Sequence, residues 1–343
     1  MNLKNTYKGG QFMKTYCSKD APLKVFGIPF FDTKKEFRRL PDELIEKLPN
    51  LEHLGKRCPG ARIGFRTDAE EFTVKVILKT LKPDVGMAIY SCQAVNVMVG
   101  DRQNSKFAGL LTPPDYETKT FEKTFKKSAA MEEVTLWLLR NEEIEEVFVS
   151  IPDKAAIEAP TPYKYGPVLY YGSSITEGGC CCNVTNGYNA LLSRWLDVDY
   201  YNMGFSGNAK GEPIMADYLN TIDFKAFVLD YDHNAPTAQH LRDTHEPFYK
   251  KIREKNPDTP ILMLSRPIFR PWPDDEERKS IVKATYDNAV AAGDKNVYYV
   301  NSDEFFDDEL RDICAIDTIH PNDLGFYRMA KTILPVMKEM LEI

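Results

Sequence analysis

The sequence predicts a two-domain protein in which a small β-sandwich or jelly-roll domain precedes an α/β domain with a doubly wound parallel sheet. Three observations lead to this prediction. The chain has 343 residues, enough for two domains of ordinary size. Apolar and polar residues alternate in the first part, whereas strand-like runs alternate with long helical patterns in the second. A proline-rich stretch separates the two parts.

The region from Leu23 to Ile151 is predicted to form antiparallel strands. Residues 72–78, 134–138 and 147–149 place an apolar side chain at every second position, which buries one face of a strand. Few long helical patterns interrupt this region, and one helix is expected before the sandwich strands, over Pro41–Leu48. A β-sandwich or jelly roll accommodates such strands.

The linker is predicted from four prolines between Pro152 and Pro167, because proline breaks regular structure. We place the domain boundary near residue 160. The accessory domain with its linker then covers residues 1–160, and the second domain covers residues 161–343.

The second domain shows short apolar runs that are each followed by a helical pattern. The predicted strands are 168–171, 200–202, 226–230, 261–264 and 297–300. The predicted helices are 188–196, 238–254, 276–292 and 325–341. This alternation implies a parallel sheet with helices on both faces, so functional groups should lie at the carboxyl ends of the strands.

Four polar blocks lie at or after the ends of these elements. The first strand is followed by Gly172-Ser173-Ser174-Ile175-Thr176, which is not a G-x-S-x-G elbow because Thr176 replaces the second glycine. The next two strands end in segments 202–208 and 230–236. Segment 317–322 precedes the last helix, and its aspartate lies three residues before a histidine, so it can bind one imidazole nitrogen and leave the other for a serine.

In this order, the four blocks resemble the SGNH (GDSL-like) hydrolase superfamily over nearly all of Tyr165–Ile343. The resemblance implies a flavodoxin-like doubly wound sheet and an acyl-enzyme mechanism. The implied catalytic residues are Ser174 as nucleophile, His320 as base and Asp317 as its orienting carboxylate. The implied oxyanion hole consists of the Ser174 and Gly207 amides and the Asn234 side chain.

The sequence departs from the family pattern in two of the four blocks. Ser173 replaces the aspartate that usually precedes the nucleophile, and Asp232-His233-Asn234-Ala235 replaces Gly-x-Asn-Asp. The preceding β-rich region is similar to that of two-domain GDSL-like carbohydrate esterases. Their Gly-x-Asp-Leu-Tyr signature falls near Ala94–Met98, where the glycine, aspartate and tyrosine are all replaced.

The expected activity is therefore a serine ester hydrolase that removes short acyl groups, such as acetyl, from a carbohydrate. A thioesterase, an arylesterase or a lipase-like hydrolase remains an alternative. The altered blocks also allow a vestigial SGNH domain that acts as a binding module. The implied mechanism requires no metal and no organic cofactor.

Other reactive side chains are expected to be structural. For His233, a structural or surface role is favoured, and His240 and His245 are expected on solvated helix faces because their spacing does not suit a metal. The run Cys180–Cys182 is expected to pack near the site without catalysing the reaction. The acidic run Asp274–Glu277 is expected to be solvated or to charge a helix start.

The bulk composition narrows the range of partners. A formal net charge of −7 disfavours nucleic acids and anionic membrane surfaces, and a small-molecule or carbohydrate ester is the expected partner. No apolar run is long enough for a transmembrane helix, and the first residues lack a signal peptide, so a cytoplasmic location is expected, with a trimmed secreted form left open. Seven cysteines favour reduced thiols. A homo-oligomer is compatible with the sequence.

Overall fold

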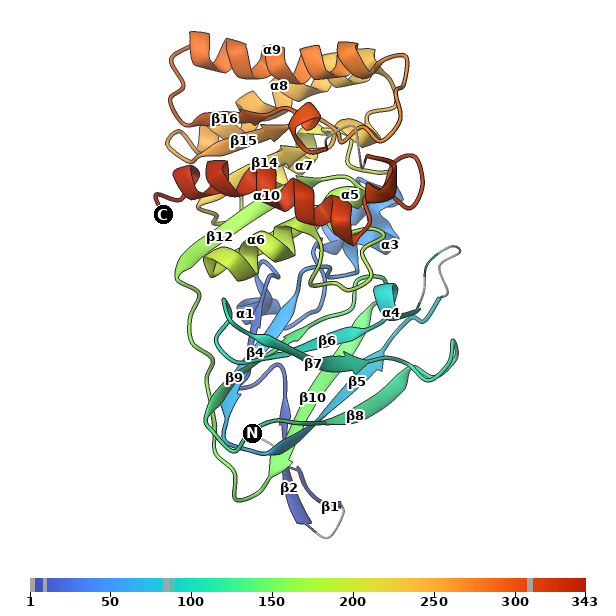
Figure 1. Ribbon diagram of the computed structural model, residues 1–343, viewed down its shortest axis with the longest axis vertical. Coiled ribbons are helices and arrows are strands. Elements are labelled where there is room, and N and C mark those ends of the chain that lie inside the picture. Colours follow the sequence, from blue (N-terminus) through green and yellow to red (C-terminus); the bar gives the residue numbers. More distant parts are fainter. Residues whose placement is uncertain (1–3, 9–10, 83–86, 88, 307–310) are drawn as a thin grey trace. The chain divides into compact units, whose positions relative to one another are not determined.

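The computed structural model describes residues 4–8, 11–82, 87, 89–306 and 311–343 (Figure 1). The chain forms two compact units, and neither is continuous in sequence. Unit 1 consists of Met1–Pro41, Gly55–Lys164 and Cys182–Thr185. Unit 2 consists of Asp42–Leu54, Tyr165–Cys181 and Asn186–Ile343. Each unit is therefore completed by a short segment from the other half of the sequence.

Unit 1 contains two antiparallel sheets. The first has the strand order β1 (Lys4–Lys8), β2 (Gln11–Cys17), β10 (Ile144–Pro152), β5 (Glu71–Leu78) and β8 (Thr120–Lys126). The second has the order β11 (Ile157–Glu158), β4 (Arg62–Thr67), β9 (Glu132–Trp137), β6 (Val95–Val99) and β7 (Lys106–Leu111), with β3 (Lys24–Phe26) beside β4. Short helices α1 (Phe31–Lys34) and α4 (Ile89–Cys92) complete the unit.

The predicted sandwich is confirmed, and its alternating pattern explains the core. In β5, Phe72, Val74 and Val76 are all fully buried, and Val147 and Val149 of β10 are buried beside them. These side chains belong to one core cluster with apolar residues of the second sheet. Because successive side chains of a strand point to opposite faces, every second residue faces this core.

Unit 2 is built on a five-stranded sheet in which all neighbouring strands are parallel. The order is β13 (Val198–Gly204), β12 (Tyr165–Gly172), β14 (Ala226–Asp230), β15 (Ile261–Leu264) and β16 (Val297–Val300). Counted along the chain, this is the order 2-1-3-4-5 of flavodoxin-like sheets, which confirms the predicted fold class.

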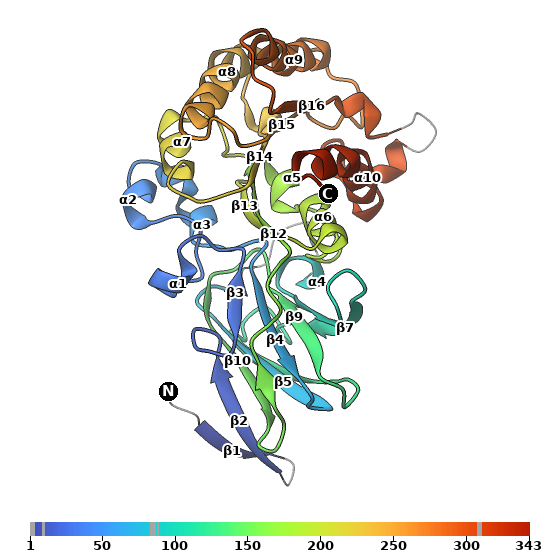
Figure 2. The same cartoon turned by 90° about the vertical axis from the view of Figure 1, so that its left-hand side faces the viewer.

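Helices cover both faces of this sheet (Figure 2). They are α5 (Ser174–Glu177), α6 (Tyr188–Leu196), α7 (Pro213–Leu219), α8 (Ala238–Lys255), α9 (Asp275–Ala291) and α10 (Asp323–Met340). Helices α6 and α10 contact each other on one face, and α7, α8 and α9 pack in sequence on the other. No helix of the described residues is long and apolar enough to cross a bilayer.

The predicted helix over Pro41–Leu48 is wrong in extent. Only α2 (Asp42–Ile45) is α-helical, and the chain continues through the 3-10 turn η1 (Pro49–Leu51) into α3 (Glu52–Gly55). Leu48 leaves the helical region, with φ −128° and ψ 67°, because Pro49 follows it. The sequence also did not predict α7, which has only seven residues and a proline at its start.

Candidate active site

The predicted nucleophile Ser174 is the first residue of α5, directly after β12. Ser173 caps this helix, since its side-chain oxygen accepts a hydrogen bond from the Ile175 amide at 3.1 Å. Serine and aspartate are both good N-cap residues, so the departure from the family aspartate retains the cap. Gly178 ends the helix in a left-handed conformation, with φ 88°.

The turn before Ser174 depends on a close approach at Gly172. A Cβ at this position would lie 2.0 Å from Thr176 Oγ1 and 2.4 Å from the Asp230 carbonyl oxygen, so only glycine fits. The Thr176 hydroxyl in turn donates to Asp230 Oδ2 at 2.8 Å, and the Tyr188 hydroxyl donates to the same oxygen at 2.8 Å. This buried cluster ties the nucleophile turn to the end of β14.

Burial raises the pKa of Asp230 to about 7, although hydrogen bonds from Thr176 and Tyr188 oppose the rise. The carboxyl group has neutral hydroxyl partners rather than a cation, so its charge is poorly compensated. This role was not predicted, because Asp230 was expected only as the last residue of a strand and the first of the polar segment 230–236.

The structure brings Ser174, His320 and Asp317 together. Ser174 Oγ lies 2.9 Å from His320 Nε2, and His320 Nδ1 lies 2.8 Å from Asp317 Oδ2. When Nδ1 donates its proton to the carboxylate, Nε2 is left as an acceptor for the serine hydroxyl. The His320 side chain is 24% exposed, so the group is accessible from solvent.

Asp317 is held in place by its own loop. Its Oδ1 accepts the Ile319 and His320 amides, both at 2.7 Å. Partial burial acts to raise the pKa of Asp317, but the hydrogen bonds from the His320 side chain and from these two amides outweigh it and lower the pKa. Asp317 is therefore ionised at neutral pH and can stabilise a protonated imidazole.

The loop that carries this pair is fixed at both ends. The Ile316 amide donates to the His320 carbonyl at 3.1 Å, and the Asn322 amide donates to the Cys314 carbonyl at 2.9 Å. Asn322 also caps α10, since its side chain accepts the Leu324 and Gly325 amides. The His320 imidazole thus belongs to a closed loop that directly precedes the long helix α10.

The predicted oxyanion donors Gly207 and Asn234 lie on two neighbouring turns at the same edge of the sheet. The Phe205 amide donates to the Gly172 carbonyl at 2.8 Å, which joins the turn after β13 to the turn before Ser174. Asn234 Nδ2 donates to the Phe205 carbonyl at 2.8 Å. Gly207 has φ 70° and no crowding atoms, so backbone conformation rather than space favours glycine there.

Glu177 is a second residue that sequence reasoning missed. It lies one helical turn after Ser174, and its Oε2 accepts the Ser206 amide at 3.1 Å. This hydrogen bond joins α5 directly to the turn that contains Gly207. Its position three residues after Ser174, the predicted nucleophile, was the available signal, because residues three apart lie on one face of a helix.

The histidines outside this cluster have structural partners. His233 Nε2 is 3.2 Å from the Pro267 carbonyl oxygen, and desolvation together with the charge of Arg266 lowers the His233 pKa to about 3. His240 Nε2 is 2.8 Å from the Lys210 carbonyl oxygen. The expectation that His245 is solvated is wrong, because it is only 1% exposed and its Nδ1 is 2.9 Å from Thr285 Oγ1.

The cysteine run lies directly after the helix that begins at Ser174. Cys180 and Cys181 are buried, and Cys181 Sγ donates to the Gly178 carbonyl at 3.0 Å. Cys182 is exposed, and all seven cysteines are free thiols. Within the described ranges, no group of three or more His, Cys, Asp or Glu side chains has a metal-binding arrangement.

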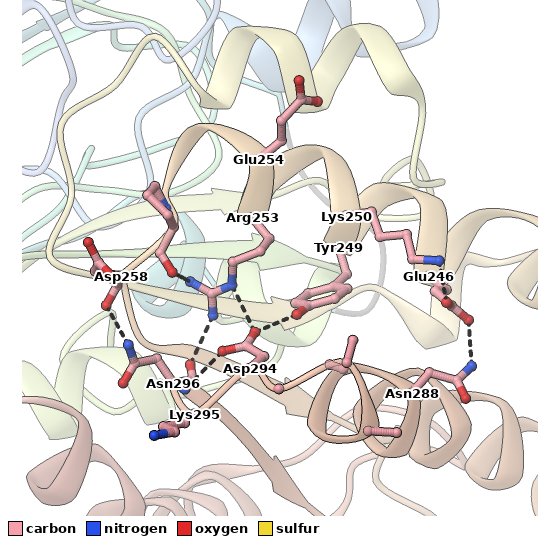
Figure 3. Close-up of a pocket in the computed structure, with 15 residues that line it drawn as sticks. Glu246, Tyr249, Lys250, Arg253, Glu254, Asp258, Asn288, Asp294, Lys295 and Asn296 are labelled. Carbon is pink, nitrogen blue, oxygen red and sulfur yellow. Dashed lines mark hydrogen bonds and ion pairs between the residues drawn. The ribbon is translucent and has the colours of Figure 1, made fainter.

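A cavity of about 780 Å³ lies at the other edge of the sheet (Figure 3). It is bordered by the last turns of α8 and α9 and by Asn296, which precedes β16. Arg253 spans it, with Nε 2.8 Å from Asp294 Oδ2 and other donors on backbone carbonyls. Its polar groups hold the ends of neighbouring elements together, and Ser174 lies at the carboxyl edge instead.

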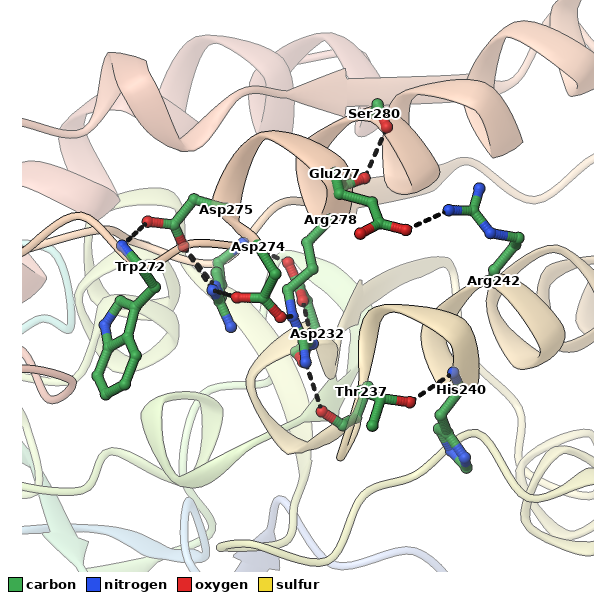
Figure 4. A network of polar contacts seen from close by, with 12 residues as sticks. Asp232, Thr237, His240, Arg242, Trp272, Asp274, Asp275, Glu277, Arg278 and Ser280 are labelled. Atoms are coloured by element: carbon green, nitrogen blue, oxygen red, sulfur yellow. Dashed lines mark hydrogen bonds and ion pairs between the residues drawn. The ribbon is translucent and has the colours of Figure 1, made fainter.

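The acidic run Asp274–Glu277 lies at the start of α9, which confirms the helix-start alternative, but it is only partly solvated (Figure 4). Glu276 is 87% exposed, but the Asp275 side chain is 7% exposed and lies 2.5 Å from Arg266 Nη2. Asp274 binds Arg266 at 2.9 Å and Arg278 at 2.5 Å. These two aspartates therefore belong to a charged network beneath the Asp232–Asn234 turn.

Two family models match the sequence. The GDSL-like Lipase/Acylhydrolase family matches residues 165–338. The GxDLY family, described as the N-terminus of SGNH-hydrolase-type esterases, matches residues 15–157. Asn96 stands near where its aspartate is expected, is fully buried, and accepts a hydrogen bond from Thr185 Oγ1 at 3.3 Å within unit 1. Among curated proteins, none matches the sequence at a significant level.

Several solved structures share the fold. A protein described as a GDSL-like lipase from Bacteroides ovatus is 24% identical, with 96% of this chain and 98% of that chain covered and a TM-score of 0.85. The salicylyl-acyltransferase SsfX3 from a tetracycline biosynthetic pathway is 19% identical, with coverages of 96% and 97% and a TM-score of 0.78. A family two carbohydrate esterase from Clostridium thermocellum is 16% identical, with coverages of 83% and 93% and a TM-score of 0.61.

The structural similarities show the fold, and the family match over residues 165–338 covers half of the chain. The chain belongs to the GDSL-like lipase/acylhydrolase family and is a carboxylic ester hydrolase of the SGNH type.

Proposed function

We propose that this esterase removes short acyl groups, acetyl above all, from a carbohydrate, with Ser174, His320 and Asp317 as its catalytic triad. One observation carries the proposal. Ser174 Oγ, His320 and Asp317 form a chain with contacts of 2.9 and 2.8 Å, within the range in which a proton is transferred.

In the proposed reaction, Ser174 Oγ attacks the ester carbonyl carbon while His320 Nε2 accepts the hydroxyl proton. The tetrahedral oxyanion is bound by the Ser174 and Gly207 amides and by Asn234 Nδ2. Its collapse breaks the bond to the alcohol, which takes the proton from His320. Water then attacks the acyl-serine with His320 again as base, and the acid leaves with Ser174 restored.

The carbohydrate proposal is supported by relatives and by charge. The Clostridium thermocellum esterase was solved in complex with cellohexaose, and an acetyl xylan esterase from Butyrivibrio proteoclasticus shares the fold with a TM-score of 0.56. A net charge of −7 disfavours polyanionic partners such as nucleic acids. An uncharged sugar ester meets no such repulsion.

The test is hydrolysis of p-nitrophenyl esters from acetate to octanoate, together with acetylated xylo-oligosaccharides, by the wild type and Ser174→Ala. We expect activity on acetate and on the oligosaccharides that is lost in Ser174→Ala. Ser206→Ala is the matched control, because this serine is exposed on the neighbouring turn and its structural contacts come from backbone atoms.

Other outcomes assign other functions. A preference for octanoate indicates a lipase-like enzyme, and cleavage of acyl thioesters or aryl esters alone indicates a thioesterase or an arylesterase. A folded wild type with no activity on any ester overturns the proposed hydrolase and favours a binding module.

A further inference from the structure

The turn that carries Asn234 is a single 3-10 turn, η2 (Asp232–Asn234), which follows β14. The Asn234 amide donates to the Tyr231 carbonyl at 2.9 Å, and the Ala235 amide donates to the Asp232 carbonyl at 3.1 Å. Two backbone hydrogen bonds restrain so short a turn only weakly. Asn234 Nδ2, the proposed oxyanion donor, also donates to the Phe205 carbonyl at 2.8 Å, and the position from which the side chain reaches that carbonyl depends on what holds both ends of the turn.

Arg278 of α9 binds both ends of this turn. Its Nη1 donates to the Asp232 carbonyl at 3.1 Å and to Asp232 Oδ1 at 3.2 Å, and its Nη2 donates to the Ala235 carbonyl at 3.0 Å. One planar guanidinium group thus bridges the residues on either side of His233 and Asn234. A guanidinium group keeps its donors in a fixed plane, so it also fixes the distance between the two carbonyls.

The guanidinium group is itself fixed. The Arg278 side chain is 5% exposed and the Asp232 side chain 1%, and Arg278 Nε lies 2.5 Å from Asp274 Oδ2 (Figure 4). The Arg266 amide donates to Asp232 Oδ2 at 3.2 Å, so both carboxylate oxygens are bound. Five separate contacts therefore determine where Arg278 and Asp232 lie.

Energetic considerations suggest that the Arg278–Asp232 ion pair contributes more to the conformation of the turn than to the stability of the fold. A buried ion pair gains about as much from attraction as it loses by leaving water, so its net contribution to folding is small. A hydrogen-bonding side chain in an oxyanion hole, by contrast, loses effect steeply when it is displaced by a fraction of an ångström. The network is well suited to holding a turn in one conformation.

We propose that Arg278 is a positioning residue for the oxyanion hole, which fixes Asn234 by bridging the Asp232 and Ala235 carbonyls. This proposal rests on the function proposed for Asn234. A lysine at position 278 keeps the charge but concentrates its donors on one nitrogen, so it cannot bridge the two carbonyls in the same way. The turn then loses one of its two anchored ends.

The experiment is a double-mutant cycle with the wild type, Arg278→Lys, Asn234→Ala and the double variant. Hydrolysis of p-nitrophenyl acetate is measured, and kcat is expressed per active site titrated with a fluorophosphonate. We expect Arg278→Lys to lower kcat about ten- to a hundredfold with little change in KM, because the oxyanion forms only in the transition state. Asn234→Ala should lower kcat about a hundredfold or more.

The cycle distinguishes an Arg278 that acts on kcat through Asn234 from one that affects kcat independently of Asn234. If Arg278 acts through Asn234, the double variant has the kcat of Asn234→Ala, because no donor is left to position. A double variant whose loss equals the product of the single losses overturns the proposal, as does Arg278→Lys with wild-type kcat. A wild type without esterase activity overturns the proposed function itself.

Two further variants complete the design. Arg253→Lys is the matched control, because its guanidinium group also binds an aspartate and several carbonyls, but at the opposite edge of the sheet, and its kcat should be unchanged (Figure 3). Asp274→Asn serves if Arg278→Lys does not fold. Asp274 is 37% exposed and contacts Arg278 without contacting the turn, and its smaller expected loss in kcat should also vanish in Asn234→Ala.

Discussion

The hydroxyl of Thr176, two residues after Ser174, donates to the buried carboxyl group of Asp230 at 2.8 Å. This contact joins the turn after β12, which carries Ser174, to the end of the adjacent strand β14, as does the hydrogen bond from the Ser173 amide to the Asp230 carbonyl at 3.2 Å. Because the hydrogen-bond partners of this carboxyl group, Thr176 and Tyr188, are neutral hydroxyls, the proton on Asp230 affects the stability of the folded protein.

The first prediction concerns stability between pH 4 and 8. The pKa of Asp230 is about 7 in the folded protein and about 3.8 when unfolded, so the unfolded chain releases this proton first as pH rises. Asp230 therefore lowers the free energy of unfolding across this window, by up to roughly 1.4 kcal/mol per unit of pH. Asp230→Asn removes this dependence but can still accept hydrogen bonds.

Urea unfolding of the wild type and Asp230→Asn at several pH values tests this. Asp230→Asn should become more stable relative to the wild type as pH rises from 4 to 8. Parallel stability profiles would show that Asp230 ionises in the folded protein as readily as in the unfolded chain.

The second prediction concerns His245, whose effect on stability changes with pH in the opposite direction to that of Asp230. Burial lowers the pKa of His245 to about 3, so its neutral ring contributes full stability above pH 6.5 and loses it as pH falls toward 3. His245→Phe cannot be protonated, so the stability of this variant relative to the wild type should rise as pH falls from 7 to 4. Urea unfolding at the same pH values measures this relative stability. A difference in the free energy of unfolding that stays constant with pH would contradict the prediction.

The third prediction concerns Asp317. Asp317→Asn should lower kcat about a thousandfold or more, because the amide neither fixes the tautomer nor stabilises the imidazolium. The Asp317 side chain is 47% exposed, so the variant should fold normally. Asp312→Asn, an exposed change on the preceding 3-10 turn, is the control and should retain full activity. Equal activity of Asp317→Asn and the wild type would remove Asp317 from the proposed triad.

The fourth prediction concerns His233, which neighbours Asn234. Since desolvation and the charge of Arg266 lower its pKa to about 3, His233 stays neutral over the working range of an esterase. His233→Gln should therefore leave the shape of the pH profile of kcat/KM unchanged, even if its height falls. A displaced acidic limb would show that His233 titrates during the reaction.

The sequence predicted those parts of the site that depend on local spacing. Ser174 and Asn234 follow recognisable strands, and Asp317 lies three residues from His320, so their placement needed no knowledge of the sheet order. The structure brings Ser174 within 2.9 Å of His320 across 146 positions of sequence. Only the ordered set of motifs indicated that contact.

The charged network could not be predicted in this way. Arg278 and Asp232 are 46 residues apart, and their contact depends on how α9 packs beside the turn after β14. The acidic run indicated the start of a helix, but its ion pairs with Arg266 could not be predicted before the position of that cation was known. His245 had a usable signal, since Leu241, Phe248 and Ile252 share its helix face and are also buried.

The exchange of short segments between the two units limits how this enzyme can be divided or recombined. Asn50, from the first part of the sequence, donates to Asn208 Oδ1 at 3.1 Å within unit 2, one residue beyond Gly207. A gene fragment that starts at Tyr165 would encode Ser174, His320 and Asp317 but not this neighbour of the turn that contains Gly207. The second half of the sequence therefore does not encode all of unit 2. A chimera that exchanges unit 2 between relatives would have to include residues 42–54.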